Sequence, residues 1–377
     1  MSKYDNASLV QIPSGYKAGT LYSVLPANGD GDFDFTRASI ATRVNADGLI
    51  ETVASGVPRL DYPILNGVVQ SCPALLLEPA RTNELLYSQE LDNAWWAKTD
   101  VSISANSIAS PDGSLTADLI TESATTGLHR VYRTLTPNGN NSFSFFVKSN
   151  GVRWIVLAAG NTTNFGVHTS FDIQNGVVGT SLIGTSKIEN YGNGWYRCIV
   201  SGLANGGATS LNLYLCDGDN VISYTGDGTS GVYAWGGQLE LGSYATSYIP
   251  TSGSTVTRNQ DIFTRDGIGS LINSTEGVLF VEMAKHNGNT VAPVISLNNG
   301  TSSQTVALYY FSTDEIAFDV ISSSPNVSGV SSSYNTDNFN KIALKYNPTT
   351  KNMVIYKYGE DDLSKKPPFQ LKTIKFE

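Results

Sequence analysis

The sequence predicts an all-β protein, in which an extended N-terminal arm precedes two antiparallel β-sandwich domains. Three observations predict this class. Apolar and polar residues alternate with a period of two in many short segments, which is the pattern of half-buried strands. Segments rich in Gly, Asn and Asp, such as "NGNN" and "GDGTSG", separate them and are typical of turns. Apolar residues at the helical period of 3.6 are almost absent.

Residues 1–85 form the predicted arm. Apolar and polar residues alternate poorly in them, and they hold prolines that interrupt regular strands, among them Pro26, Pro58, Pro63, Pro73 and Pro79. Their apolar side chains are too dispersed along the chain to bury one another. We therefore expect the arm to lie on another surface, either that of its own first sandwich or that of another subunit. Glu78 and Arg81 are expected to pair where the arm meets the sandwich.

Residues 86–250 form the predicted first sandwich, a jelly roll, and contain all five tryptophans. Because side chains alternate across a strand, "LNLYLC" puts Leu211, Leu213 and Leu215 on one face and the pair Asn212 and Tyr214 on the other. The same rule applied to "VYAWGGQLEL" places four apolar side chains on one face: Tyr233, Trp235, Leu239 and Leu241.

Residues 251–269 are polar and read as a linker. Residues 270–377 form the predicted second, smaller sandwich, in which Ile342, Leu344 and Tyr346 alternate with polar or small residues. The strands predicted outside the arm lie in residues 86–250 and 270–377.

The amino-acid composition excludes some classes of function and favours others. The formal net charge is −9, and charged residues make up only 15% of the chain, so the basic patch of a nucleic-acid binder is not expected. A surface rich in hydroxyl, amide and aromatic groups suits sugar recognition or subunit packing. The sequence has no run of 18 apolar residues, so we expect no insertion into a membrane. The N-terminus lacks the pattern of a secretory signal, so we expect the protein to be synthesised in a cytoplasm.

No metal or cofactor is expected. The three cysteines share no metal-binding spacing: Cys72, Cys198 and Cys216. Asp30, Asp32 and Asp34 are spaced as in a calcium loop, but the twelfth position is Ala41 instead of Glu and no helix flanks the segment. Three further aspartates are predicted to form turns, with a structural calcium site as the alternative: Asp217, Asp219 and Asp227.

No catalytic residues are identified, and we expect the protein not to be an enzyme. The three histidines lie far apart without metal-site or triad spacing: His129, His168 and His286. A strand-to-helix GxSxG elbow is absent. Acidic residues such as Asp172 and Glu240 do not form a recognisable glycosidase pair.

Aromatic side chains supply the candidate carbohydrate-binding residues, because a flat ring matches the apolar face of a sugar. Three tryptophans sit in strand patterns and are expected in the core: Trp154, Trp195 and Trp235. The adjacent Trp95 and Trp96 point in opposite directions on an extended segment, so one can be buried while the other stacks on a sugar. Asn212 and Tyr214, on the face without leucines, are the second candidate pair.

Two stretches resemble the N-terminal part of tailed-bacteriophage virion proteins of the tail-fibre or head-fibre type: "SLVQIPSGYKAGTLYSVLPANGDGDFDFTRASIATRVNADGLIETVASGVPRLDY" and "CPALLLEPARTNELLYSQELDNAWWAK". The segments "PDGSLTADLI", "GWYR" and "YTGDGTSGVYAWGGQLELGSYATSYIPT" resemble the carbohydrate-binding-like jelly roll of those proteins. From "STEGVLFVEM" onward the chain resembles a concanavalin- or laminin-G-like lectin sandwich, although it is short for that type.

The resemblance implies a structural component of a phage particle, assembled in the cytoplasm of a bacterial host. It implies a homotrimer that docks through its arm on other capsid or tail proteins and displays its sandwiches to host-surface glycans. Two alternatives stay open. One is a purely architectural decoration protein without glycan binding, and the other is a polysaccharide depolymerase with a cleft between subunits.

Overall fold

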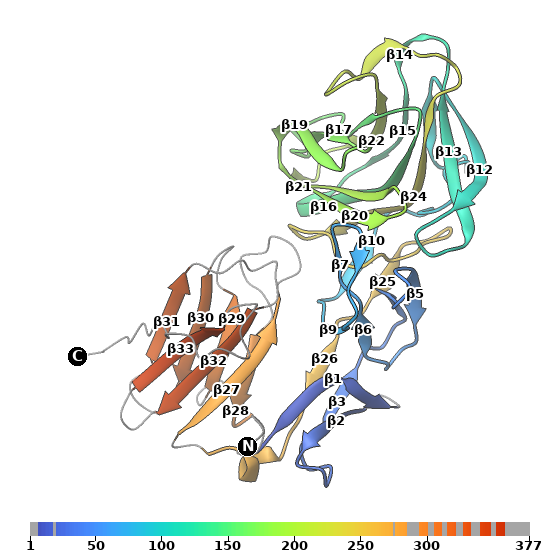
Figure 1. Ribbon diagram of the computed structural model, residues 1–377. Helices are drawn as coiled ribbons and strands as arrows, with labels where there is room; N and C mark the ends of the chain where they lie inside the picture. The colour runs from blue at the N-terminus through green and yellow to red at the C-terminus, as the bar shows by residue number, and fades with distance from the viewer. Residues whose placement is uncertain are drawn as a thin grey trace. The chain divides into compact units, whose positions relative to one another are not determined.

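The chain is all β, as predicted. The computed structural model describes residues 7–17, 20–273, 276–284, 294–300, 305–310, 315–321, 327–332, 340–347 and 352–358. Within these ranges the regular elements are strands, apart from the short 3₁₀ helix η1 (Ile268–Leu271) (Figure 1). None of the described residues belongs to a helix long and apolar enough to cross a membrane.

Two six-stranded antiparallel sheets form a sandwich in the middle of the chain (Figure 1). The first, which we call sheet A, runs in the order β11 (Ala97–Thr99), β15 (Arg130–Leu135), β22 (Thr209–Cys216), β17 (Trp154–Ala159), β18 (His168–Asp172) and β19 (Val177–Ile183). The second, sheet B, runs in the order β12 (Val101–Ala109), β13 (Leu115–Glu122), β24 (Gly231–Leu241), β16 (Asn138–Asn150), β21 (Trp195–Asn205) and β20 (Thr185–Gly192). A two-stranded pair, β14 (Thr126–Leu128) with β23 (Ser223–Thr225), adjoins them in sequence.

The core of the sandwich lies between sheets A and B and is built from alternate positions of their strands. Phe143 and Phe145 of sheet B and Leu211, Leu213 and Leu215 of sheet A are at most 1% exposed and belong to one apolar cluster. Burying each such side chain stabilises the fold by about 1.5–3 kcal/mol. The predicted leucine face of "LNLYLC" is therefore confirmed.

Sheet B is also buried on its outer face. Phe146, Trp195, Trp235 and Tyr248 form a second cluster there, and Ile50 from the predicted arm is part of it. The Phe146 ring contacts those of Trp235 and Tyr248 edge-on, and the centroids of Phe146 and Trp235 are 5.4 Å apart. The arm thus supplies a cover for a sheet face that would otherwise expose large aromatic side chains. The prediction that Trp195 and Trp235 are core residues is confirmed.

One predicted strand face is wrong. Trp235 packs on the outer face of sheet B, whereas Leu239 lies in the core between the sheets. The reason is a bulge: Phe146 pairs with Trp235 and Ser144 with Gln238, so Gly236 and Gly237 together oppose one residue. Glycine is required here, since a Cβ at either position would lie 2.7–2.8 Å from a ring carbon of Phe145 or Phe146. The extra residue reverses the alternation.

The segment before the sandwich consists of short paired strands. The pairs are β4 (Ala41–Val44) with β5 (Ile50–Val53), β6 (Arg59–Asp61) with β9 (Ala74–Leu76), β7 (Ile64–Leu65) with β8 (Val68–Val69), and β10 (Arg81–Asn83) with β25 (Val256–Arg258). A four-stranded sheet has the order β1 (Val10–Lys17), β2 (Thr20–Leu25), β3 (Phe33–Thr36) and β26 (Ile262–Thr264). Strands from the predicted arm therefore pair with strands from the predicted linker.

The residues from Phe35 to Phe263 form one compact unit. For this part of the predicted arm, the supporting surface is therefore the chain's own sandwich. The described residues of Tyr16–Thr20 belong to the same unit. A second unit contains Leu21–Asp34 together with the described residues before Tyr16 and after Phe263. The five tryptophans all lie in the first unit.

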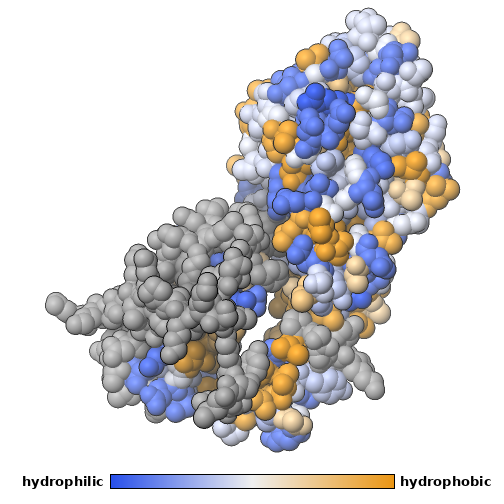
Figure 2. Space-filling view, in the orientation of Figure 1, coloured by the Kyte–Doolittle hydropathy of each residue, from blue (hydrophilic) through white to orange (hydrophobic). Residues whose placement is uncertain are grey.

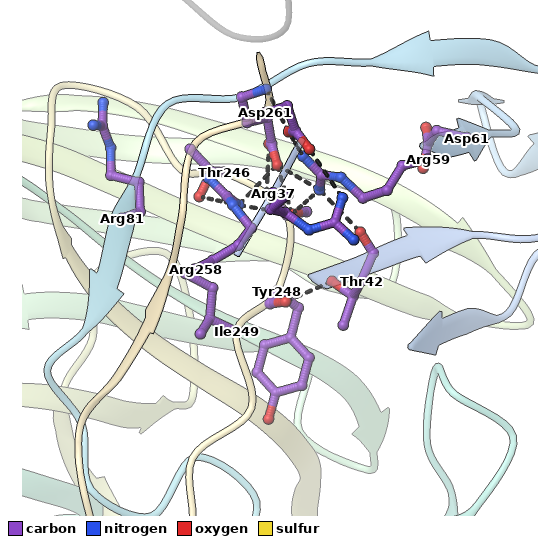
Figure 3. A network of polar contacts seen from close by, with 12 residues as sticks. Arg37, Thr42, Arg59, Asp61, Arg81, Thr246, Tyr248, Ile249, Arg258 and Asp261 are labelled. Atoms are coloured by element: carbon purple, nitrogen blue, oxygen red, sulfur yellow. Dashed lines mark hydrogen bonds and ion pairs between the residues drawn. The ribbon is translucent and has the colours of Figure 1, made fainter. Parts of the chain in front are cut away.

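A buried group of charges fastens the arm to the segment that follows the sandwich. We call Arg37, Arg59, Glu78, Arg258 and Asp261 the ionic cluster; Figure 3 shows three of its arginines around Asp261. Nη1 of Arg59 and Nη1 of Arg258 each lie 2.7 Å from Glu78 Oε2, and Nη1 of Arg37 lies 3.0 Å from Asp261 Oδ1.

The ionic cluster is almost fully shielded from water. Arg59 also pairs with Asp261, and the side chains of both residues are 0% exposed. Burial lowers the pKa of Arg59, but the carboxylates of Glu78 and Asp261 outweigh it and raise that pKa above its ordinary value. Arg81 is not part of the ionic cluster, and its Nε lies 3.9 Å from Oε2 of Glu240. Three guanidinium groups thus share two carboxylates in the interior.

The C-terminal strands form a second sandwich. Its sheets are β27 (Gly277–Met283), β32 (Asn340–Asn347) and β33 (Asn352–Tyr358), and β28 (Val294–Asn298), β29 (Thr305–Tyr310), β30 (Glu315–Ile321) and β31 (Val327–Ser332). Leu308 and Phe318 of one sheet and Ile342 and Leu344 of the other share an apolar cluster, in which each is at most 1% exposed. The pattern predicted for Ile342, Leu344 and Tyr346 is thereby confirmed.

Candidate functional site

Asn212 and Tyr214 lie on the outer face of sheet A, opposite to the buried leucines of the same strand. Cross-strand partners with directly opposed Cα atoms point to the same face of a sheet. The register therefore places Arg130 beside Tyr214 and Tyr132 beside Asn212. On the other flank of β22, Val156 opposes Tyr214 and Ala158 opposes Asn212. A continuous outer face results, which four side chains define: Arg130, Tyr132, Asn212 and Tyr214. We call these four the platform.

Contacts with the other three platform residues hold the Arg130 side chain in place. Its Nη1 donates to Asn212 Oδ1 at 2.9 Å and to the Tyr214 hydroxyl at 3.1 Å. The guanidinium carbon lies 4.2 Å from the centroid of the Tyr132 ring and 5.6 Å from that of Tyr214, both within cation–π range. The planar guanidinium of Arg130 thus contacts both tyrosine rings on the outer face of the sheet.

Exposure differs between the four platform residues. Asn212 is 0% and Tyr214 6% exposed, whereas Arg130 and Tyr132 are half-buried. Asn212 is further held by its Nδ2, which donates to main-chain oxygens of Ala158 and Ser210. Arg130 and Tyr132 are therefore the more exposed side chains of the platform, and the two predicted residues, Asn212 and Tyr214, hold the Arg130 side chain.

Sequence reasoning missed Arg130 and Tyr132, although a signal was present. In "HRVYRTL", Val131 alternates with both residues, and Val131 is 1% exposed in the core. The strand could therefore have been divided into faces as "LNLYLC" was. What the sequence does not contain is the pairing of β15 with β22, which brings residues more than 80 positions apart into contact.

Trp95 and Trp96, the other predicted pair, pack on the opposite side of sheet A. Trp96 is 2% exposed, and its Nε1 donates to the main-chain oxygen of Tyr87 at 2.8 Å. Trp95 is half-buried, lies edge-on to Trp96 with a centroid distance of 4.9 Å, and carries the Arg133 guanidinium 4.7 Å from its ring. One ring is buried and the other partly accessible, as predicted. The four predicted residues are divided between the two sides of one sheet.

Trp154 is half-buried on the outer face of sheet A, which is less than the burial predicted for it. It opposes Asp172 of β18, whose carboxylate accepts hydrogen bonds from Arg153 at 2.5 Å and from Asn175 Nδ2 at 2.9 Å. Burial raises the pKa of Asp172, but these hydrogen bonds outweigh it and lower the pKa to about 2. Asp172 therefore serves as a structural acceptor.

The depressed pKa of Asp172 predicts a pH-dependent stability. Its carboxylate has an unfolded-state pKa of about 4, so its contribution is fully present above about pH 4 and is lost as the pH falls towards about 2. We expect Asp172→Asn to be less stable than the wild type at pH 7, with a difference that shrinks between about pH 4 and 2. Urea unfolding at several pH values measures this, with the exposed Asp217→Asn as control. A difference independent of pH would contradict the assignment.

Histidines and turn aspartates have structural partners. His129 is buried, with Nδ1 2.8 Å from the main-chain oxygen of Asp100, and His168 Nε2 lies 2.7 Å from Asn220 Oδ1. His286 is outside the described residues. Asp227 accepts from the main-chain N–H groups of Thr229 and Ser230, as expected of a turn. In the described ranges no three His, Cys, Asp or Glu side chains gather in a way that could hold a metal ion.

A small polar cavity lies at the edge of sheet B. It has a volume of about 180 Å³ and is lined by Gln89, Glu90, Asp92, Asn106, Thr116 and Asp118. Burial raises the pKa of Asp118. Its carboxylate accepts from the main-chain N–H groups of Leu91 at 2.7 Å and Asn106 at 2.9 Å. These bonds hold the loop at Leu91 and the irregular part of β12 at Asn106 against Asp118 of β13.

Comparison with known proteins adds no family assignment. No protein-family model matches this sequence, and no curated protein matches it.

Proposed function

We propose that this chain is a non-catalytic structural protein of a bacteriophage particle, a head or tail fibre or appendage component. It docks on other virion proteins through its N-terminal arm and displays its β-sandwiches to glycans of the host surface. The observation that carries the glycan-binding part is the platform on sheet A. The virion part is supported by the sequence resemblance of the arm.

The platform has the chemistry of a sugar site. Sugars are bound by flat groups that cover the apolar ring face, combined with fixed donors and acceptors for the hydroxyl groups. Tyr132 and the Arg130 guanidinium supply the flat groups, and Arg130 is immobilised by Asn212 and Tyr214. Because the donor is already oriented in the free protein, little conformational entropy is lost when a ligand binds.

The arm has the properties of a docking segment. Among the arm residues that the structure describes, seven large apolar side chains are more than a third exposed: Ile12, Tyr22, Val24, Ile40, Leu65, Val68 and Leu77. On the face shown in Figure 2, apolar side chains lie in several separate patches among polar ones. Where exposed apolar groups gather in one patch, they are typical of surfaces that contact another protein. An exposed edge strand of the arm can also pair with a strand of another protein and so extend its sheet.

A trimeric assembly would make weak sugar contacts effective. A single shallow platform offers few contacts, so we expect one copy to bind weakly. Several copies on one particle turn later contacts into intramolecular events and raise the overall affinity by about 10²–10⁴. The proposed homotrimer therefore agrees with the modest size of the platform.

Labelling of phage particles with antibodies against the chain, combined with an adsorption assay, tests this proposal. We expect labelled particles, and we expect free protein to reduce adsorption to host cells. Particles without label would overturn the virion role. If particles are labelled but free protein does not reduce their adsorption, the chain is an architectural decoration protein. New reducing ends in host polysaccharide incubated with the protein would indicate a depolymerase.

A further inference from the structure

The Arg130 guanidinium has no carboxylate partner among the described residues. Other arginines of the chain, such as Arg37, Arg59, Arg153 and Arg258, form ion pairs of 3.0 Å or less. Arg133, Arg197 and Arg265 lack such a pair, but each donates to a main-chain oxygen. Arg130 donates to side-chain oxygens only, those of Asn212, Tyr214 and, at 3.5 Å, Thr99.

The contacts of Arg130 orient its charge without neutralising it. Nη1 uses its hydrogen atoms on Asn212 and Tyr214, which are neutral acceptors. Nη2 has no acceptor among the residues that the structure describes, so two N–H donors point away from the contacts that hold the group. A half-buried cation is poorly solvated, and hydrogen bonds between a guanidinium and a carboxylate are shorter and about twice as strong as neutral ones.

We propose that Arg130 binds the carboxylate of an acidic sugar, so that the ligands of the platform are glycans bearing a hexuronate or a sialate. This inference rests on the proposed function, since it names the class of glycan for the same site. The carboxylate accepts from Nη2 of Arg130, and the sugar ring lies against the accessible part of Tyr132. Asn212 and Tyr214 act as positioning residues because they fix the guanidinium.

The net charge of −9 opposes an anionic ligand only weakly. Charges farther than about 8 Å from the site are largely screened at physiological ionic strength, whereas a contact pair is screened much less. The local contact with Arg130 therefore decides the sign of the interaction.

Isothermal titration calorimetry on the full chain tests the inference. The probes are tetragalacturonate, a hyaluronan tetrasaccharide and 3′-sialyllactose, each paired with its carboxyl-reduced form, which keeps the sugar ring but loses the charge. We expect at least one acidic probe to bind about tenfold more tightly than its reduced form. Arg130→Met should abolish this ratio and Arg130→Lys should keep part of it, while the ion-paired surface variant Arg43→Met should leave it unchanged.

Two outcomes would overturn the inference. Equal binding of acidic and reduced forms would show a sugar site that does not use the charge, in which case the proposed function stands. No binding of any acidic probe would also reject it, while the adsorption assay still tests the proposed function separately. Circular dichroism and the melting temperature of each variant exclude unfolding as the cause of a lost preference.

Discussion

Glu78→Gln is expected to lower the free energy of unfolding by about 3–5 kcal/mol, the range found when one partner of a buried ion pair is removed. Glutamine keeps the volume but removes the negative charge that both Arg59 and Arg258 contact at 2.7 Å. Oε2 of Glu78 also accepts from the Ser247 hydroxyl at 2.6 Å. Asp261 alone would then face three buried guanidinium groups, which leaves positive charge uncompensated in the interior.

Urea unfolding followed by tryptophan fluorescence measures this loss. All five tryptophans lie in the unit from Phe35 to Phe263, so the signal reports the unit that contains the ionic cluster. The matched control is Glu51→Gln, whose ion pair with Arg43 is at the surface, with 37% of the Glu51 side chain exposed. We expect that change to cost about 0–1 kcal/mol. Equal losses for the two variants would contradict a structural role for the cluster.

Trp96→Ala is expected to cost about 3–5 kcal/mol, as for other large side chains deleted from a core. Trp96 is 2% exposed, contacts Phe145 and donates a hydrogen bond to Tyr87. Removal leaves a cavity between sheets A and B and an unpaired main-chain oxygen. The loss follows from its place in the core, whatever the ligand of the protein.

Trp95→Ala provides the comparison for Trp96. Its ring is half-buried and contributes an edge-on contact with Trp96 and a contact with Arg133, together worth about 1–2 kcal/mol. Far-UV circular dichroism in urea measures both variants, because it does not depend on the tryptophans that are changed. Similar losses for the two variants would show that the division into a buried and an accessible ring is wrong.

The sequence predicted the regular parts of the fold because they depend on local pattern. The all-β class follows from alternation and turn composition, and so do the two faces of the strand with Leu213 and Tyr214. The bulge at Gly236 and Gly237 was missed because a single extra residue reverses the alternation without changing the composition. Two adjacent glycines in a strand pattern were the available signal.

The parts that could not be predicted depend on long-range pairing. Arg37 and Asp261 of the ionic cluster are 224 positions apart, and Glu78 pairs with Arg59 and Arg258. Its nearer neighbour Arg81, which the sequence suggested as its partner, lies beside Glu240. Likewise, the platform arises only when β15 pairs with β22. The local pattern places Tyr214 on a face but does not identify the residue beside it.

Hydroxyl-radical footprinting of the full chain, with and without polysaccharide extracted from host cells, tests most directly that the outer face of sheet A is the ligand surface. The account predicts that oxidation of Tyr132 falls at saturating polysaccharide, while oxidation of the half-buried Tyr62, remote from the platform in sequence, is unchanged. Unchanged oxidation of Tyr132, or protection confined to residues outside sheet A, would contradict it.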